Sequence, residues 1–169
     1  KVNLATLQST DLASLQPSPV YLAAKRATDI LLTLAAVPLL LPLCLIMAIL
    51  IRIDSPGSAI FVQQRIGKGN KVFKMYKFRS MKPSENPEDT PQFADRDAHR
   101  ITRLGAFIRK FRIDELPQFL NVLLGDMSLI GPRPEQPGFV EKFESEVPYY
   151  SYRHIVRPGI TGWAQVNQG

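Results

Sequence analysis

Cysteine and histidine are scarce in this sequence. Its 169 residues include one cysteine, Cys44, and two histidines, His99 and His154. A disulfide framework needs paired cysteines and a thiolate metal site needs several, so the sequence excludes both. Two histidines are also too few for a histidine-based metal cluster. The chemistry of this chain therefore has to come from other side chains.

Acidic residues are missing from the stretch 100–112, which holds five arginines and lysines. The stretch 52–82 has a similar bias, with eight basic residues against one acid, and the whole chain carries a net charge of +6 and a pI of about 9.6. This balance favours anionic partners: nucleic acid, nucleotides or anionic lipid headgroups. The stretch 83–99 reverses the sign, with five acids against one arginine, and its three prolines predict a mobile loop.

Charge of either sign is absent from Ile30–Ile51, a run of 22 residues, and a membrane helix needs about 20. Basic residues flank the run on both sides, Lys25 and Arg26 before it and Arg52 after it. A single span cannot keep both basic flanks on the cytoplasmic side, as the positive-inside rule requires.

Two prolines interrupt this apolar run. Pro38 and Pro42 each remove a helix hydrogen-bond donor and predict a bend near mid-membrane. The bend and the basic flanks fit a re-entrant helix-break-helix that enters one leaflet and returns. A kinked signal-anchor helix is the alternative, because membrane helices tolerate prolines. A cleaved signal peptide is disfavoured, because about 25 residues precede the run.

The remaining sequence predicts a small domain of mixed structure. The β-favouring runs 58–64 and 71–79 are joined by Gly67–Asn70, which is typical of a hairpin turn. In the second run, alternation puts Lys77 and Arg79 on one side, where a solvated basic strand face is the simplest interpretation. Apolar side chains at helical spacing predict an amphipathic helix over 101–111.

Length and composition allow one sizeable core. We therefore predict a helix-rich α+β fold, with an N-terminal re-entrant membrane helix followed by a small cytoplasmic domain that contains a β-hairpin and several helices. The predicted boundaries are a polar lead-in over 1–24, the membrane helix over 25–52 and the cytoplasmic domain over 53–169. The chain starts without methionine and reads as a fragment that lacks a C-terminal part.

Asp114 and Glu115 are two adjacent acids that directly follow the basic stretch 100–112. In the structural interpretation, Asp114 caps a helix that tolerates Pro117 in its first turn and ends at Gly125. In the functional interpretation, the pair holds a metal ion or attacks a phosphate that the basic residues recruit. Downstream, Arg133 lies between two prolines that stiffen its backbone, which suits an arginine that binds a phosphate.

Taken together, several motifs resemble the bacterial sugar transferases known as monotopic phosphoglycosyl transferases. The resemblance covers about residues 25–169, in unbroken order. The motifs that carry it are Lys25-Arg26 with Asp29, Tyr76-Lys-Phe-Arg79-Ser-Met81, Asp114-Glu-Leu-Pro-Gln118, Asn121-Val-Leu123 with Gly125-Asp-Met-Ser128, Gly131-Pro-Arg133-Pro134 and Arg157-Pro-Gly-Ile-Thr-Gly-Trp-Ala-Gln165.

The resemblance implies an enzyme at the cytoplasmic face of the bacterial inner membrane. This enzyme would catalyse the first membrane step of polysaccharide or glycoconjugate synthesis. It implies transfer of a sugar-1-phosphate from a UDP-sugar to undecaprenyl phosphate, with release of UMP, a covalent phospho-sugar intermediate and a Mg²⁺ requirement. By position, Asp114 is the nucleophile and a Mg²⁺ ligand, and Glu115 is its partner. Arg79, Arg109 and Arg133 match phosphate-binding positions, and Pro42 matches the break of the re-entrant helix.

The sequence departs from the family pattern at two positions. Leu41 precedes Pro42 where relatives often carry serine, and Arg112 stands where many carry a small polar residue, so Arg112 receives no catalytic role.

Two rival functions remain: a membrane-anchored basic module that binds anionic lipid without catalysis, and a nucleic-acid-binding protein, which the uncharged run argues against. The sugar is not identified, and homo-oligomerisation is left open.

Overall fold

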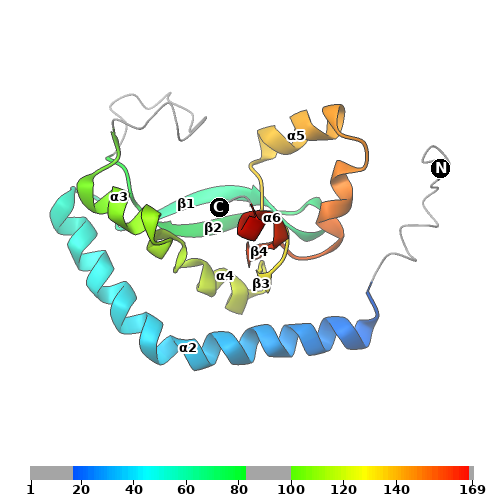
Figure 1. Cartoon of the computed structure of the whole chain (residues 1–169), viewed down its shortest axis with the longest axis horizontal. Helices are drawn as coiled ribbons and strands as arrows, with labels where there is room; N and C mark the ends of the chain where they lie inside the picture. The colour runs from blue at the N-terminus through cyan, green and yellow to red at the C-terminus, as the bar shows by residue number, and fades with distance from the viewer. Residues whose placement is uncertain (1–16, 83–99, 168–169) are drawn as a thin grey trace.

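The computed structural model describes residues 17–82 and 100–167, which form a helix-rich α+β structure with two small sheets (Figure 1). This confirms the helix-rich α+β part of the predicted fold. The predicted loop over 83–99 and most of the predicted lead-in lie outside the described residues. In chain order the elements are α2 (Pro19–Asp54), β1 (Ile60–Ile66), β2 (Val72–Phe78), α3 (Arg103–Lys110), α4 (Gln118–Leu124), β3 (Ser128–Ile130), α5 (Pro137–Glu146), β4 (Gly159–Thr161) and α6 (Trp163–Asn167).

Helix α2 is longer than the predicted membrane helix. Ser18 caps its N-terminus by accepting a hydrogen bond from Tyr21 N (3.2 Å), and Pro19 occupies the first turn, where a missing N–H costs nothing. Residues 19–24, predicted as lead-in, are therefore helical. The helix remains continuous through Pro38 and Pro42 and bends in its middle, as Figure 1 shows.

Strands β1 and β2 form the predicted hairpin. They pair antiparallel from Ile60↔Phe78 to Ile66↔Val72. A short 3₁₀ turn over Lys68–Asn70 connects them, with Gly69 at a positive φ of 67°, a conformation that glycine adopts without steric cost. The outer edge of β2 is held by Asn121 of α4, whose amide accepts from Tyr76 N (3.1 Å) and donates to Lys74 O (2.7 Å).

Both ends of α2 pack on this domain. At the C-terminal end, Met47 and Ile51 are buried with Ala59, Phe78 and Ile108, which join α2 to the hairpin and to α3. A second small core of Met75, Val122 and Met127 lies between β2 and α4. The middle of α2 exposes its leucines and isoleucines instead.

The N-terminal end of α2 is attached by polar contacts. Asp29, 3% exposed, accepts hydrogen bonds from Lys25 Nζ (2.7 Å), Ser128 Oγ (2.8 Å) and Leu129 N (3.3 Å). Arg26 donates to the carbonyl oxygens of Val122 (2.5 Å) and Leu123 (2.9 Å), in the last turn of α4. A cation at the carbonyl end of a helix satisfies unpaired acceptors and complements the helix dipole.

Candidate active site

Asp114 and Glu115 lie in a 3₁₀ turn over Ile113–Glu115, ahead of α4. The predicted helix starting at Asp114 is therefore wrong in its first residues, although it does end at Gly125, which adopts a positive φ of 93°. The backbone bonds here join residues three apart: Leu116 N donates to Ile113 O (3.1 Å), Phe119 N to Leu116 O (3.1 Å) and Leu120 N to Pro117 O (3.0 Å). This stretch therefore has 3₁₀ geometry up to the start of α4.

The residue before this turn has an uncommon backbone conformation. Arg112 has φ 56° and ψ 21°, in the left-handed region that side chains other than glycine, asparagine and aspartate seldom enter. The conformation ends α3 and turns the chain toward β2. It also brings the Arg112 guanidinium to 3.7 Å from Glu115 Oε1, so this residue contacts the acid pair although its sequence position suggested no role.

Glu115 is the centre of a cationic cluster. Its carboxylate is 7% exposed, and three cations approach one oxygen, Oε1: Arg133 at 3.3 Å, Arg112 at 3.7 Å and Lys77 at 3.8 Å. A buried carboxylate persists only where such partners compensate its lost hydration. Glu115 therefore neutralises part of the basic neighbourhood.

Asp114 is half-buried, whereas its neighbour Glu115 is buried. Burial raises the pKa of its carboxyl above the usual value near 3.8, and the negative charge of Glu115 acts in the same direction. Lys77 and Arg109 oppose that shift. A partly desolvated carboxylate with cations nearby has the electrostatic setting of a nucleophile or a metal ligand.

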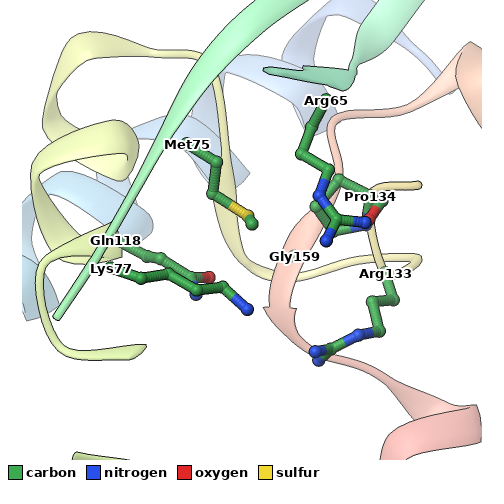
Figure 2. A pocket seen from close by; sticks show the side chains of 7 residues that line it. All are labelled: Arg65, Met75, Lys77, Gln118, Arg133, Pro134 and Gly159. Carbon is green, nitrogen blue, oxygen red and sulfur yellow. The ribbon is translucent and has the colours of Figure 1, made fainter. Parts of the chain in front are cut away.

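A small pocket, partly open to solvent, lies next to Glu115, whose ion-pair partners Lys77 and Arg133 line it. Figure 2 shows the side chains of Arg65, Lys77 and Arg133 pointing toward its centre from the hairpin and from the segment after β3. Met75, Gln118, Pro134 and Gly159 complete the lining. The pocket therefore presents three cations to an anion, and two of them, Lys77 and Arg133, also contact Glu115.

The predicted phosphate-binding arginines occupy different places. Arg133 lines the pocket, and Arg109 lies in the last turn of α3, where its charge acts on Asp114. Arg79 instead holds the end of α2, donating to Ser55 O (2.5 Å), Ser55 Oγ (2.9 Å) and Pro56 O (2.8 Å).

Lys77 and Arg79 do not form a shared solvated face, because the Lys77 side chain is only 16% exposed and faces Glu115. That simple interpretation of the strand was wrong for Lys77. The pocket role of Arg65 was missed too. Its only sequence signal is its place within the basic stretch 52–82, and the register Arg65↔Phe73 then puts it on the same face of the hairpin as Lys77.

The residues present fit Mg²⁺ only in part. Among the described residues, no group of three or more histidine, cysteine, aspartate and glutamate side chains converges. Mg²⁺ binds oxygen ligands and commonly takes one or two carboxylates together with substrate phosphates. Asp114 and Glu115 can supply such carboxylates next to the anion pocket, so a magnesium ion that arrives with a diphosphate is compatible with the site.

Comparison with known proteins identifies the family. Residues 20–169 match the family described as bacterial sugar transferase. The chain belongs to the bacterial sugar transferase family. This confirms the resemblance that the motifs indicated, and the match includes both α2 and the whole candidate active site.

Named relatives of this sugar transferase act on undecaprenyl phosphate. The UDP-N-acetylgalactosamine-undecaprenyl-phosphate N-acetylgalactosaminephosphotransferase of Aeromonas hydrophila is 56% identical over 170 residues, which are 100% of this chain and 40% of the relative. A putative undecaprenyl-phosphate N-acetylgalactosaminyl 1-phosphate transferase of Bacillus subtilis is 51% identical, over 79% of this chain and 74% of the relative. The UDP-glucose:undecaprenyl-phosphate glucose-1-phosphate transferase of Escherichia coli is 45% identical, over 85% of this chain and 31% of the relative.

Proposed function

We propose that the protein transfers a sugar-1-phosphate from a UDP-sugar to undecaprenyl phosphate and releases UMP. The observation that carries the proposal is the half-buried Asp114, whose charge interacts with Lys77, a cation that lines the pocket together with Arg65 and Arg133. Cations favour binding of a diphosphate and stabilise the charge that builds up when it is cleaved. The family and the names of its relatives supply the identities of donor and acceptor.

The reaction proceeds in two displacements at one phosphorus atom. An Asp114 carboxylate oxygen attacks the phosphorus next to the sugar, the bond to the bridging oxygen breaks, and UMP leaves with that electron pair. An oxygen of the lipid phosphate then attacks the same phosphorus and breaks its bond to Asp114. The product is a sugar on undecaprenyl diphosphate, and Asp114 returns as a carboxylate.

Each cation near the acids has a task in these steps. Arg133 and Arg109 hold phosphate oxygens, which reduces the repulsion between the Asp114 carboxylate and the anionic phosphorus centre. Glu115 holds Arg133 and Lys77 in place through its buried oxygen. When bound, Mg²⁺ supplies a further positive charge on the diphosphate, and Asp114 and Glu115 are the residues able to hold it. Arg79 acts from further away, by fixing the end of α2.

A re-entrant placement of α2 in the cytoplasmic leaflet of the inner membrane completes the proposal. An 18-residue window of helix α2 has a mean hydropathy of 2.8, and α2 is the one helix of the described residues that is long and apolar enough to cross a membrane. Its two ends contact the same domain, Asp29 through Ser128 and Ile51 through Ile108. A polar domain cannot lie on both sides of a bilayer, so the bend at Pro38 and Pro42 has to return the chain to its starting side.

The test is a covalent adduct on Asp114. The full-length protein is incubated with Mg²⁺ and either UDP-N-acetylgalactosamine or UDP-glucose, without lipid acceptor, and its intact mass is measured. We expect one added sugar-phosphate, which Asp114→Asn abolishes together with at least a ~10³-fold loss of turnover, as is usual when a catalytic group is removed.

Two outcomes would contradict parts of this proposal. Normal turnover without any adduct would rule out the two-step route and leave the overall transfer intact. Full activity of Asp114→Asn, or no transfer at all from a panel of UDP-sugars, would favour a membrane-anchored basic module that binds anionic lipid without catalysis.

A further inference from the structure

We propose that Arg65 and Lys77 complete the phosphate-binding pocket with Arg133, and that Glu115 is the counter-ion that phosphate oxygens displace. The inference rests on the proposed function and deepens it. It assigns binding roles to two hairpin residues, and it separates them from Arg79, which holds the end of α2.

Charge around the pocket is unbalanced. Ion pairs among the described residues place Lys77, Arg112 and Arg133 on Glu115, and Arg65 and Arg153 on Glu135. Five cations thus share two carboxylates, a formal excess of three positive charges. Like charges held together in a poorly hydrated pocket repel one another, and an anion relieves that repulsion.

Arg65 is positioned before any ligand arrives. Its Nε and Nη2 donate to Gln63 Oε1 (3.2 and 2.7 Å), and its Nη1 donates to Pro134 O (3.0 Å). A guanidinium has five N–H groups, so these three bonds fix its plane and leave two N–H groups for a ligand. A guanidinium fixed in this way loses little entropy when it binds phosphate oxygens.

Lys77 is a mostly buried ammonium group that a bound anion would stabilise. Its side chain is 16% exposed, and its closest carboxylate oxygen, Glu115 Oε1, lies 3.8 Å away, beyond hydrogen-bond distance. Burial and the charges of Arg133 and Arg65 lower the pKa of this lysine, while Glu115 and Asp114 oppose that change. A phosphate oxygen in the pocket would supply the close acceptor that this ammonium group lacks in its contact with Glu115.

Glu115 binds the cations near the pocket only weakly. One of its oxygens is shared by three cations at 3.3–3.8 Å, longer than charge-assisted hydrogen bonds of about 2.8 Å. Phosphate oxygens present more charge and more acceptor positions than this single atom. Their arrival would transfer Lys77 and Arg133 from Glu115 to the substrate and free the carboxylate beside Asp114.

Pyrophosphate binding tests this inference without depending on turnover. The full-length protein in detergent is titrated calorimetrically with inorganic pyrophosphate in the absence of Mg²⁺. We expect Lys77→Gln and Arg65→Gln each to raise the Kd about tenfold, the loss of one charge-assisted hydrogen bond. Lys77→Arg should retain most of the affinity. Glu115→Gln should lower the Kd, because the competing carboxylate is gone.

Lys74→Gln is the matched control, since Lys74 lies on the same strand with its side chain exposed to solvent. It removes the same charge and should leave the Kd unchanged. If Lys77→Gln and Arg65→Gln bind pyrophosphate as Lys74→Gln does, with unaltered melting temperatures, the pocket assignment is overturned. A Kd for Glu115→Gln at or above the wild-type value overturns the counter-ion role.

Steady-state kinetics identify the source of the phosphate. A rise in KM for the UDP-sugar alone assigns the pocket to the donor diphosphate, and a rise for undecaprenyl phosphate alone assigns it to the lipid. Both support an anion pocket. Failure of this inference differs from failure of the proposed function, because transfer from a UDP-sugar persists in the first case and is absent in the second.

Discussion

At Asp114, burial and charge act in opposite directions. Burial and Glu115 raise the pKa of the carboxyl, while Lys77 and Arg109 lower it, and the net shift is upward. A raised pKa in the folded state means that folding favours the protonated acid. The ionised carboxylate therefore reduces folding stability at neutral pH, and that penalty is lost as the pH falls through the folded-state pKa.

A stability measurement can detect this penalty. We expect Asp114→Asn to raise the melting temperature near pH 7, because asparagine has nearly the same shape and carries no charge. The gain should shrink as the pH is lowered through the folded-state pKa of Asp114, which lies above the usual value near 3.8, because the wild-type side chain then becomes neutral too.

Thermal unfolding between about pH 7 and about pH 4 measures the difference. Glu146→Gln is the control, since Glu146 is an exposed acid whose partner Lys142 lies 3.9 Å away on the same helix. The assigned cause would be contradicted if Asp114→Asn and the wild type melted at the same temperature at neutral pH. It would also be contradicted if the gain in melting temperature grew as the pH falls.

Arg112 makes a contact that the sequence did not predict. From sequence it received no catalytic role, because many relatives carry a small polar residue there, and a left-handed backbone is one that asparagine tolerates. The same backbone turns the Arg112 side chain onto Glu115. The contact depends on a φ angle, which no spacing pattern encodes.

At the scale of elements, the local patterns located most of the secondary structure. The hairpin strands and the helix α3 were predicted to within about two residues at each end, because alternation and helical spacing are local signals. The start of α4 was missed because the turn before it is held by 3₁₀-type bonds, such as Leu116 N to Ile113 O, which sequence spacing does not distinguish from α-helical bonds. Neither parallel pairing of β3 with β4 nor the pocket it borders is visible in such patterns.

The contact between α2 and β3 yields a prediction at this scale. Asp29→Ala removes the acceptor for Lys25, Ser128 and Leu129 N. We expect it to lower the free energy of unfolding by about 2 kcal/mol. The loss is smaller than that for breaking a fully buried ion pair, because Lys25 is partly exposed. Thr28→Ala is the matched control, because Thr28 is exposed and its hydroxyl bonds within its own helix (Ala24 O, 3.0 Å).

Thermal unfolding in detergent measures both variants. For a chain of this size, 2 kcal/mol corresponds to roughly 4–8 °C. Equal melting temperatures for Asp29→Ala and Thr28→Ala would show that this polar contact does not attach the N-terminal end of α2 to the domain.

For the molecule as a whole, the topology of α2 is the main question. The domain lies within the angle formed by the two halves of this helix, and it contacts both (Figure 1). The contacts at Asp29 and Ile51 lie 22 residues apart, about 33 Å along a helix. Both are made with the same domain, one from each half of the bent helix.

Cysteine labelling tests the topology. In a Cys44→Ser background, single cysteines at the exposed positions Val20 and Val62 should react with an impermeant reagent from the same side of the membrane. That side should be the cytoplasmic one, so labelling should require permeabilised cells. Labelling of the two positions from opposite sides would establish a spanning helix and contradict the re-entrant placement.

By itself, the sequence determined the family, the apolar helix with its two prolines and the adjacent acids Asp114 and Glu115. These features are contiguous, and residue order is enough to read them. Only the tertiary structure decided which cations face those acids. Lys77 is separated from Glu115 by 38 residues and Arg26 from Val122 by 96, and packing alone brings such pairs together. For the same reason Arg79, the expected phosphate ligand, holds a helix end, while Arg65 lines the pocket.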